Sequence, residues 1–270
     1  MANWVKNILC CRCSPMRFEQ VMEFVRGDDT EDNADFDFEK IKPTPKELLE
    51  VTEGMNGYFK GFYIRHVCAH QAVRPLHGIP FPDDPINMNR IELMDICRKI
   101  DAAEFQHLDG QLDFLCETEI SPKDYSDPEI QIDICRRALH IGWMYFRNRN
   151  LYECESWYEW RLQNWGTKWN CCITSVDKEK QEFIFETAND APITLLELLS
   201  ILFPDVIFVL MYADENLGYN CNKVKIKNGK LYIYADYSAV QGSDVARSFA
   251  INIWGLTEED LAETEDKEEK

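Results

Sequence analysis

The spacing of apolar positions changes several times along the chain, and each spacing predicts one kind of element. Apolar residues that alternate with polar ones, or that form short runs, predict strands at 4–11, 36–41, 169–176, 182–187, 206–212, 224–226 and 231–234. Apolar residues three and four positions apart predict helices at 15–27, 127–146, 151–165, 193–203 and 243–255. Segment 89–116 fits one long helix or two short ones, and 44–47 has the residues of a helix start.

Residues at the ends of these segments support the predicted boundaries. Ser14 and Pro15 form an N-cap followed by proline at the first helical position. Gly166 follows the predicted helix 151–165 and can adopt the left-handed conformation that ends helices. Asn228 and Gly229 separate the last two predicted strands and are the residue pair that favours a tight hairpin turn.

Apart from the short strand at 36–41 and the helix at 151–165, the elements outside residues 44–150 follow the order strand, helix, strand, strand, helix, strand and hairpin. This is the split β-α-β order of a ferredoxin-like sandwich, an α+β fold in which helices cover one face of an antiparallel sheet. We predict a discontinuous ferredoxin-like domain from 1–43 and 151–237. A large helical insertion occupies 44–150, and a C-terminal helix with an acidic tail occupies 238–270.

Acidic residues outnumber basic ones by 48 to 29, which gives a formal net charge of −19. This balance argues against direct nucleic acid binding, which requires clustered Lys and Arg. An alternative is that the acidic surface mimics nucleic acid and inhibits a host DNA-binding protein. The sequence contains no run near the roughly 20 apolar residues of a membrane span and no signal segment, so we expect a cytoplasmic protein without membrane contact.

Eleven cysteines are scattered along the chain, and an odd, dispersed set is not typical of a disulfide framework. Reduced thiols fit this pattern. His66 and His70 stand four positions apart, a spacing that can bind a metal on a helix, and His77 could supply a third ligand. Because a site needs three or four ligands, a histidine pair on a helix surface or loop is the favoured interpretation. We predict no metal and no cofactor.

Four of the seven tryptophans lie within thirteen residues, from Trp157 to Trp169. Trp165, Thr167, Lys168 and Trp169 could form a stacking platform for a base, with Lys168 against a phosphate. The simpler interpretation is structural, because a buried indole can anchor a helix to the corner of a sheet. The two interpretations differ in whether these indoles are sealed or open.

Asp214 and Glu215 follow the apolar strand that contains Tyr212, and paired carboxylates can perform acid–base chemistry. Acidic residues at strand ends are also common in solvated turns. The sequence contains no recognisable order of nucleophile, base and orienting group and no phosphate-binding glycine loop, so we predict no catalytic residues.

The run Trp165-Gly166-Thr167-Lys168-Trp169 also carries a resemblance. Together with Asn3-Trp4, Phe36-Asp37-Phe38, Trp157-Tyr158 and Tyr212 followed by Glu215, it resembles the YubB ferredoxin-like family of bacteriophage and plasmid proteins. The resemblance covers the first 45 residues and about 150–235, and it implies the ferredoxin-like fold but no assigned activity.

These observations lead to one expected function and two alternatives. We expect a non-catalytic accessory protein of a phage or plasmid-type mobile element that binds a host or phage protein in a bacterial cell. The first alternative is a protein that binds or sequesters a small ligand, a nucleotide above all. The candidate binding residues for these two functions are Trp165, Thr167, Lys168, Trp169, Tyr212, Asp214 and Glu215. The second alternative is the acidic nucleic-acid mimic.

Overall fold

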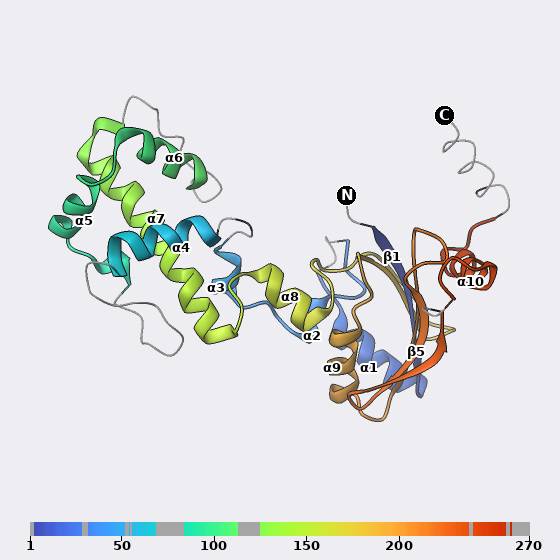
Figure 1. Ribbon diagram of the computed structural model, residues 1–270. Helices are drawn as coiled ribbons and strands as arrows, with labels where there is room; N and C mark the ends of the chain where they lie inside the picture. Colours follow the sequence, from blue (N-terminus) through green and yellow to red (C-terminus); the bar gives the residue numbers. More distant parts are fainter. Residues whose placement is uncertain are drawn as a thin grey trace. The chain divides into compact units, whose positions relative to one another are not determined.

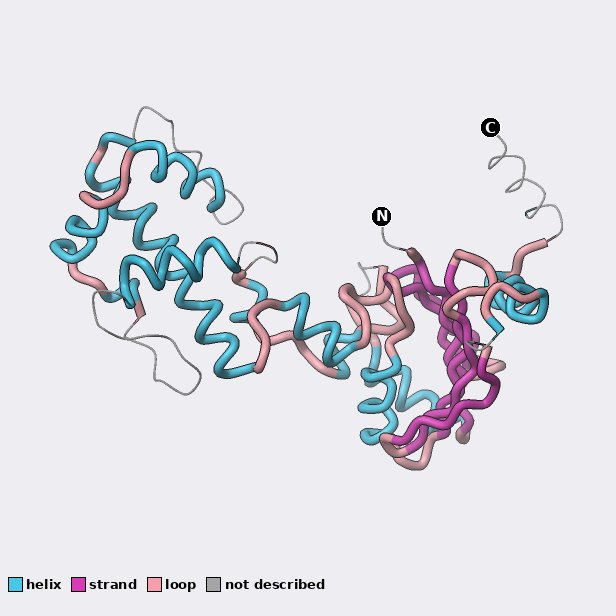
Figure 2. Tube along the Cα trace, viewed as in Figure 1, coloured by secondary structure: helices cyan, strands magenta, loops and turns pink. Residues whose placement is uncertain are grey.

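The structure of the 270-residue chain is a computed structural model, and it describes residues 3–28, 32–51, 54, 56–68, 84–112, 125–237, 240–257 and 260. The chain divides into two compact units. Residues 1–43 and 161–270 form one of them, the ferredoxin-like unit, and residues 44–160 form the other, the helical unit. All described strands belong to the ferredoxin-like unit, whereas the described elements of the helical unit are helices (Figure 2).

Six strands build one antiparallel sheet in the order β2-β3-β1-β4-β5-β6. Their bounds are β1 (Trp4–Arg12), β2 (Cys172–Asp177), β3 (Glu182–Ala188), β4 (Ile207–Asp214), β5 (Cys221–Lys227) and β6 (Lys230–Asp236). The N-terminal strand β1 lies between β3 and β4, so segments on both sides of the helical unit share one sheet. The first four strands have the ferredoxin-like order, which confirms the predicted α+β fold, and the β5–β6 hairpin extends the sheet.

Helices α1 (Pro15–Val25) and α9 (Ile193–Leu202) cover one face of this sheet, which we call the inner face (Figure 1). Helix α1 begins as predicted, because the Ser14 side chain accepts a hydrogen bond from the Arg17 backbone and Pro15 takes the first position. The Phe18 ring then lies 5.3 Å from that of Phe183 on β3. Leu195, Leu196 and Leu199 of α9 are fully buried, as expected for a core helix.

Helix α10 (Asp244–Trp254) covers part of the opposite, outer face (Figure 1). Ser243 caps its start, and Gly255 ends it in the left-handed conformation with φ of 71°, in agreement with the predicted helix at 243–255. Ala246 and Ala250 pack against Ala213 and Cys221 of the sheet. The predicted sandwich places helices on one face, and α10 adds a third layer on the other.

The predicted strand at 36–41 is wrong, because this segment contains the short helix α2 (Phe38–Ile41). The Asp37 side chain accepts a hydrogen bond from the Glu39 backbone and caps the helix. The Phe38 backbone donates to Asn170 Oδ1 at 3.0 Å instead of to a neighbouring strand. Phe36 and Phe38 are nonetheless both buried, with the Phe36 ring stacked 4.9 Å from that of Phe185.

The predicted helix at 151–165 is wrong at its start. Helix α7 (Pro128–Tyr152) runs on beyond the predicted 127–146, and α8 (Trp157–Trp165) begins only after a break. The break occurs at Glu153, which adopts a left-handed φ of 61° and whose backbone donates to the Arg149 carbonyl. The next strand, predicted from 169, begins only at Cys172, with an irregular register around Ile173 at φ of 51°.

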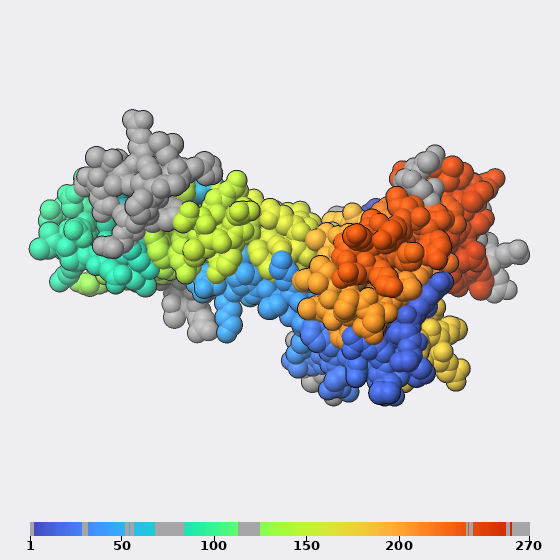
Figure 3. Space-filling model, turned by 90° about the horizontal axis from the view of Figure 1, so that it is seen from below, coloured from blue at the N-terminus to red at the C-terminus, as the bar shows by residue number. Residues whose placement is uncertain are grey.

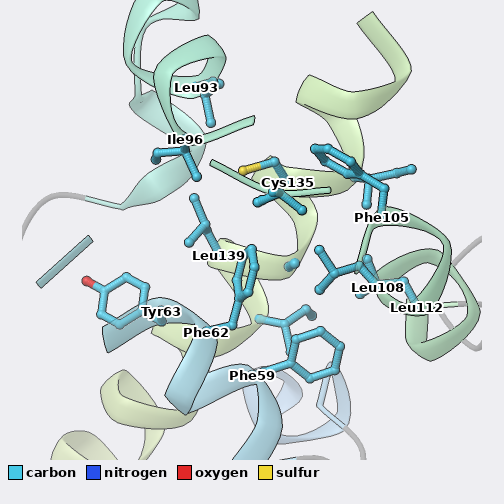
Figure 4. Packing of buried hydrophobic residues seen from close by; sticks show 14 of the residues in the cluster. Phe59, Phe62, Tyr63, Leu93, Ile96, Phe105, Leu108, Leu112, Cys135 and Leu139 are labelled. Carbon is cyan, nitrogen blue, oxygen red and sulfur yellow. The ribbon is translucent and has the colours of Figure 1, made fainter. Parts of the chain in front are cut away.

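The helical unit has a core of its own. It contains α3 (Lys46–Leu49), α4 (Asn56–Tyr63) with the π-turn η1 (Ile64–Cys68), the 3-10 turn η2 (Pro85–Asn87), α5 (Arg90–Cys97), α6 (Ala102–Leu112) and α7. The described part of segment 89–116, residues 89–112, therefore holds two short helices. Figure 4 shows buried side chains of α4, α5 and α6 packed against those of α7, among them Phe59, Phe62, Leu93, Ile96, Phe105, Leu108, Cys135 and Leu139. Among the described residues, no helix combines the length and apolar character that crossing a membrane requires.

Candidate functional site

The seven predicted site residues all belong to the ferredoxin-like unit and lie around one turn and one strand end. The turn follows α8 at Gly166, whose φ is 86° and whose backbone donates to the carbonyls of Arg161 and Leu162 at 3.2 Å. A Cβ at this position would lie 3.3 Å from the Ala191 carbonyl oxygen. Both observations explain why the turn needs glycine.

Trp165, directly before this turn, is sealed inside the unit with no exposed surface. Its indole Nε1 donates to the Lys42 carbonyl at 2.9 Å, and its ring meets the edge of Phe38 at 5.6 Å. The Arg161 guanidinium lies 4.5 Å from the ring centroid. These contacts give Trp165 the structural role of an anchor between α8 and the segment that leaves the unit at Pro43.

The three residues after the turn have different environments. Thr167 is buried, and its hydroxyl donates to the Ala188 carbonyl at 2.8 Å, which fixes the turn to the end of β3. Trp169 keeps 41% of its surface exposed. Its ring lies 6.2 Å from that of Trp4 at an interplanar angle of 38°, and Lys168 Nζ is 4.2 Å from its centroid. Trp169 is therefore open to solvent and still contacted by two neighbours, Trp4 and Lys168.

The strand end at β4 contributes one exposed carboxylate. Tyr212 is buried on the inner face, and so is Asp214, whose Oδ1 accepts from the Asn216 backbone at 2.8 Å and helps to form the turn. Glu215 is exposed, and its Oε1 accepts from the Trp4 backbone at 3.0 Å. The backbone of Glu215 also donates to the Trp4 carbonyl at 2.8 Å. Asp214 and Glu215 thus lie in separate environments.

The predicted set therefore separates into buried and accessible residues. Trp165, Thr167, Tyr212 and Asp214 are buried, whereas Lys168, Trp169 and Glu215 gather around Trp4 at the end of β1. We call these last four residues the tryptophan surface. Trp4 lies outside the residues predicted for the site, because only the pairing of β1 with β3 and β4 brings it beside Trp169 and Glu215.

A buried polar cluster at the same end of the inner face was also missed. Asn7 Nδ2 donates to the Val5 carbonyl and to Thr187 Oγ1, both at 2.9 Å, and the Thr187 hydroxyl donates to the Asp190 carbonyl at 2.8 Å. Asn7 Oδ1 is buried and has no hydrogen-bond partner among the residues that the structure describes. Asp190 itself is an exposed residue, but partial desolvation of its carboxyl, together with the nearby Asp214, raises the pKa of that carboxyl. An asparagine between inward-facing Val5 and Leu9 is the sequence signal that could have identified this cluster.

His66 and His140, two of the described histidines, each contact a polar side chain. His66 is buried, its ring lies 4.5 Å from that of Phe62, and its Nε2 accepts from Arg65 Nε at 2.9 Å. His140 Nδ1 lies 2.9 Å from Asp84 Oδ1. His70 and His77 are outside the described residues. Within the part of the chain that the structure describes, no three His, Cys, Asp or Glu side chains gather as metal ligands would.

Comparison with known proteins supports the fold of the C-terminal part. A family model described as "Ferredoxin-like domain in Api92-like protein" matches residues 168–250. The chain is also similar, at 13% sequence identity, to the crystal structure of a protein api92 from Yersinia pseudotuberculosis. The match covers 87% of this chain and 99% of that chain. Its TM-score of 0.35 is too low to support any argument about this chain. No curated protein matches.

The matched segment 168–250 contains strands β2 to β6 and ends within α10. The sheet to which these strands belong has the ferredoxin-like strand order. Residues 168–250 therefore match the ferredoxin-like domain described in Api92-like proteins.

Proposed function

We propose that this chain is a non-catalytic accessory protein of a phage or plasmid-type mobile element. Its ferredoxin-like unit binds a protein partner of host or phage origin in a bacterial cell, through the tryptophan surface formed by Trp4, Lys168, Trp169 and Glu215. Membership of the YubB ferredoxin-like family, suggested by the Trp-Gly-Thr-Lys-Trp run, is part of this proposal.

The observation that carries the proposal is the exposure of Trp169. A large aromatic ring that is 41% exposed and already in contact with Trp4 and Lys168 can be covered by a partner with little further loss of conformational freedom. Tryptophan is enriched among the residues that dominate binding at protein interfaces. Lys168 and Glu215 supply charges of both signs beside it, as the polar rim of such an interface does.

A small planar ligand is less well supported as the occupant of this surface. A base held by two indoles would need both ring faces open, but Trp165 is fully buried and bonded to Lys42. The hydroxyl of Thr167 is used by the Ala188 carbonyl. Of the two indoles predicted for the stacking platform, only that of Trp169 is accessible, which favours a flat contact with a protein.

The test is quantitative capture of partners from lysates of plasmid-bearing or phage-infected bacteria, with the wild-type chain and Trp169→Ala as baits. Ile91→Ala is the matched control, because Ile91 is an exposed hydrophobic side chain in the helical unit. We expect a protein that the wild type and the control retain and Trp169→Ala loses. With the purified partner, Trp169→Ala should weaken binding about tenfold or more. Equal binding of that partner by wild type and Trp169→Ala, or no enriched protein at all, would refute the proposal.

A further inference from the structure

The β5–β6 hairpin is a local exception to the acidic character of the chain. From Cys221 to Tyr234 there are four lysines and no acidic residue, in a chain whose net charge is −19. Lys223 and Lys225 lie two positions apart on β5, while Val224 between them is buried on the inner face. Lys227 continues the series, and the register places Lys230 of β6 directly opposite it. All four lysines therefore belong to the outer face of the hairpin.

Two tyrosines accompany these lysines. Tyr232 lies opposite Lys225 in the register and is 48% exposed, and Tyr234 is 52% exposed. Lys225 Nζ lies 4.7 Å from the Tyr232 ring centroid and 5.9 Å from that of Tyr234, so both rings adjoin one ammonium group. The irregular register between Lys223 and Val224 falls beside Tyr234 and increases the local twist of the edge strand.

This part of the outer face lies beyond the area that α10 covers. Helix α10 packs on Ala213 and Cys221, which are paired at one end of β4 and β5. Lys225 pairs with Val209 toward the other end of these strands. The part of the chain coloured orange, which contains the hairpin, lies at the molecular surface in Figure 3. On the inner side, Val224 and Ile226 are buried, which gives the hairpin a firm support.

We propose that the outer face of the β5–β6 hairpin binds single-stranded nucleic acid. The ammonium groups of Lys223, Lys225, Lys227 and Lys230 contact successive phosphates, and the exposed rings of Tyr232 and Tyr234 stack with bases. An acidic peptide would pair with the lysines but would leave the tyrosine faces unused. A single strand uses both features, because every base presents a flat aromatic surface.

The net charge of −19 restrains this binding without abolishing it. Acidic residues elsewhere repel phosphates over about one Debye length, roughly 10 Å at 0.1 M salt, whereas the contacts on the hairpin are direct. Overall composition led us to expect no binding to nucleic acid. That expectation rests on the charge of the whole chain and does not consider the local cluster of lysines on this hairpin. The proposal does not depend on the tryptophan surface.

The test is fluorescence anisotropy of labelled oligo-dT and oligo-U of about twelve nucleotides, a length within the range of known single-strand sites. We expect saturable binding at low salt by the full chain. Tyr232→Leu with Tyr234→Leu should weaken it about tenfold or more, and Tyr232→Phe with Tyr234→Phe should preserve it, because phenylalanine retains the stacking face. Tyr219→Ala, at an exposed tyrosine elsewhere in the unit, is the aromatic control.

Two variants with the same change of net charge separate local from overall electrostatics. Lys225→Gln should weaken binding and reduce the slope of log affinity against log salt by about 0.7. Lys178→Gln, at an exposed lysine between β2 and β3, should leave both unchanged. Trp169→Ala should bind the oligonucleotide as the wild type does, so failure here is distinct from failure of the proposed partner surface. No saturable binding, equal effects of Lys225→Gln and Lys178→Gln, or a polyglutamate peptide that competes with the same tyrosine dependence would overturn the proposal.

Discussion

The indole Nε1 of Trp165 donates a hydrogen bond to the backbone carbonyl of Lys42 at 2.9 Å. The two residues lie on either side of the helical unit in the sequence, and the bond joins the segment leaving the ferredoxin-like unit to the helix that returns to it. The Arg161 guanidinium reinforces this closure through an ion pair with Glu39 at 3.0 Å. Trp165 therefore stabilises the contact between the segment that leaves the ferredoxin-like unit and the helix that returns to it.

Replacement of Trp165 by phenylalanine tests this role. The variant leaves the Lys42 carbonyl without its donor and removes half of a buried indole. We expect the free energy of unfolding of the ferredoxin-like unit to fall by about 1 to 3 kcal/mol. Urea unfolding followed by far-UV circular dichroism measures the change.

Trp169→Phe is the matched control for Trp165→Phe, because both remove an indole from the same turn. Trp169 is partly exposed, so the effect should stay within about 0.5 kcal/mol. Equal losses in the two variants would contradict the anchoring role of Trp165.

Gly142 on α7 lies where α7 packs tightly against α4. A Cβ there would meet the Phe59 carbonyl oxygen and would lie 2.6 Å from Tyr63 Cβ, a distance that real side chains do not tolerate. Gly142→Ala should therefore push the two helices apart and destabilise the helical unit by about 1 to 3 kcal/mol. A thermal melt followed by helical circular dichroism checks the result.

Gly110→Ala provides the opposite expectation within the same unit. Gly110 lies on α6, and a Cβ there would meet no atom of the described residues within 4 Å. Alanine should raise the stability of the helical unit by about 0.4 to 1 kcal/mol, because it restricts the unfolded chain. If Gly142→Ala and Gly110→Ala destabilised the unit by similar amounts, the close contact between α7 and α4 would not be the reason why position 142 requires glycine.

Two carboxylates should change stability with pH in opposite directions. Burial, together with nearby Glu215, raises the pKa of Glu186, although Lys6 opposes the shift. The folded state then holds this proton more tightly than the unfolded state, so the contribution is present at low pH and is lost as pH rises from the usual glutamate range to the raised pKa. Glu186→Gln should therefore be more stable than the wild type at pH 7, and the difference should vanish in acid.

Asp205 provides the contrasting case. The Arg17 guanidinium donates to both of its oxygens, at 2.7 and 3.0 Å, and lowers the pKa of the carboxyl. Its contribution is therefore present above the usual aspartate range and is lost as pH falls through the lowered pKa. Asp205→Asn should be less stable than the wild type at pH 7, with the difference again vanishing in acid. Urea midpoints measured from pH 3 to 7 decide both cases, and parallel profiles for the two variants would contradict the assigned causes.

Features set by a few neighbouring residues were predictable from the sequence. Ser14 caps α1, Gly255 ends α10, and Asn228 and Gly229 adopt positive φ of 48° and 70° in the turn between β5 and β6. In each case the backbone chemistry of the residue itself selects the conformation. The strand order followed as well, because the sequence of elements leaves few ways to build one sheet.

Features set by distant residues were not predictable. The alternation of Phe36 and Phe38 is equally consistent with a strand, and the helix there depends partly on Asn170, which accepts a hydrogen bond from the Phe38 backbone. Trp165 and Trp169 belong to one motif, but one is buried under Lys42 and the other lies open beside Trp4. Their difference arises from parts of the chain far from the motif, so local pattern could not separate anchor from surface.

Because contacts at Trp165 hold the two ends of the ferredoxin-like unit together, we expect this unit to fold without the helical unit. Arg161 pairs with Glu39, and Lys42 Nζ donates to Asn164, so the two ends of the ferredoxin-like unit are already held together by that unit's own contacts. A Gly/Ser linker of about six residues, with a mean span of roughly 13 Å, should replace residues 44–160 without strain. We expect the resulting protein to unfold cooperatively in urea and to have a circular dichroism spectrum richer in strand.

Residues 44–160 expressed alone should in turn give a helical spectrum and a melt of their own, because their buried cluster is formed within that segment. Trp165→Phe placed in the linker-joined protein should lower its stability by the same amount as in the full chain, since the Lys42 carbonyl is retained. If the linker-joined protein lacked a cooperative transition, the contacts of Trp165 and Arg161 would not suffice to close the sheet. The helical unit would then be required for the fold of the ferredoxin-like unit.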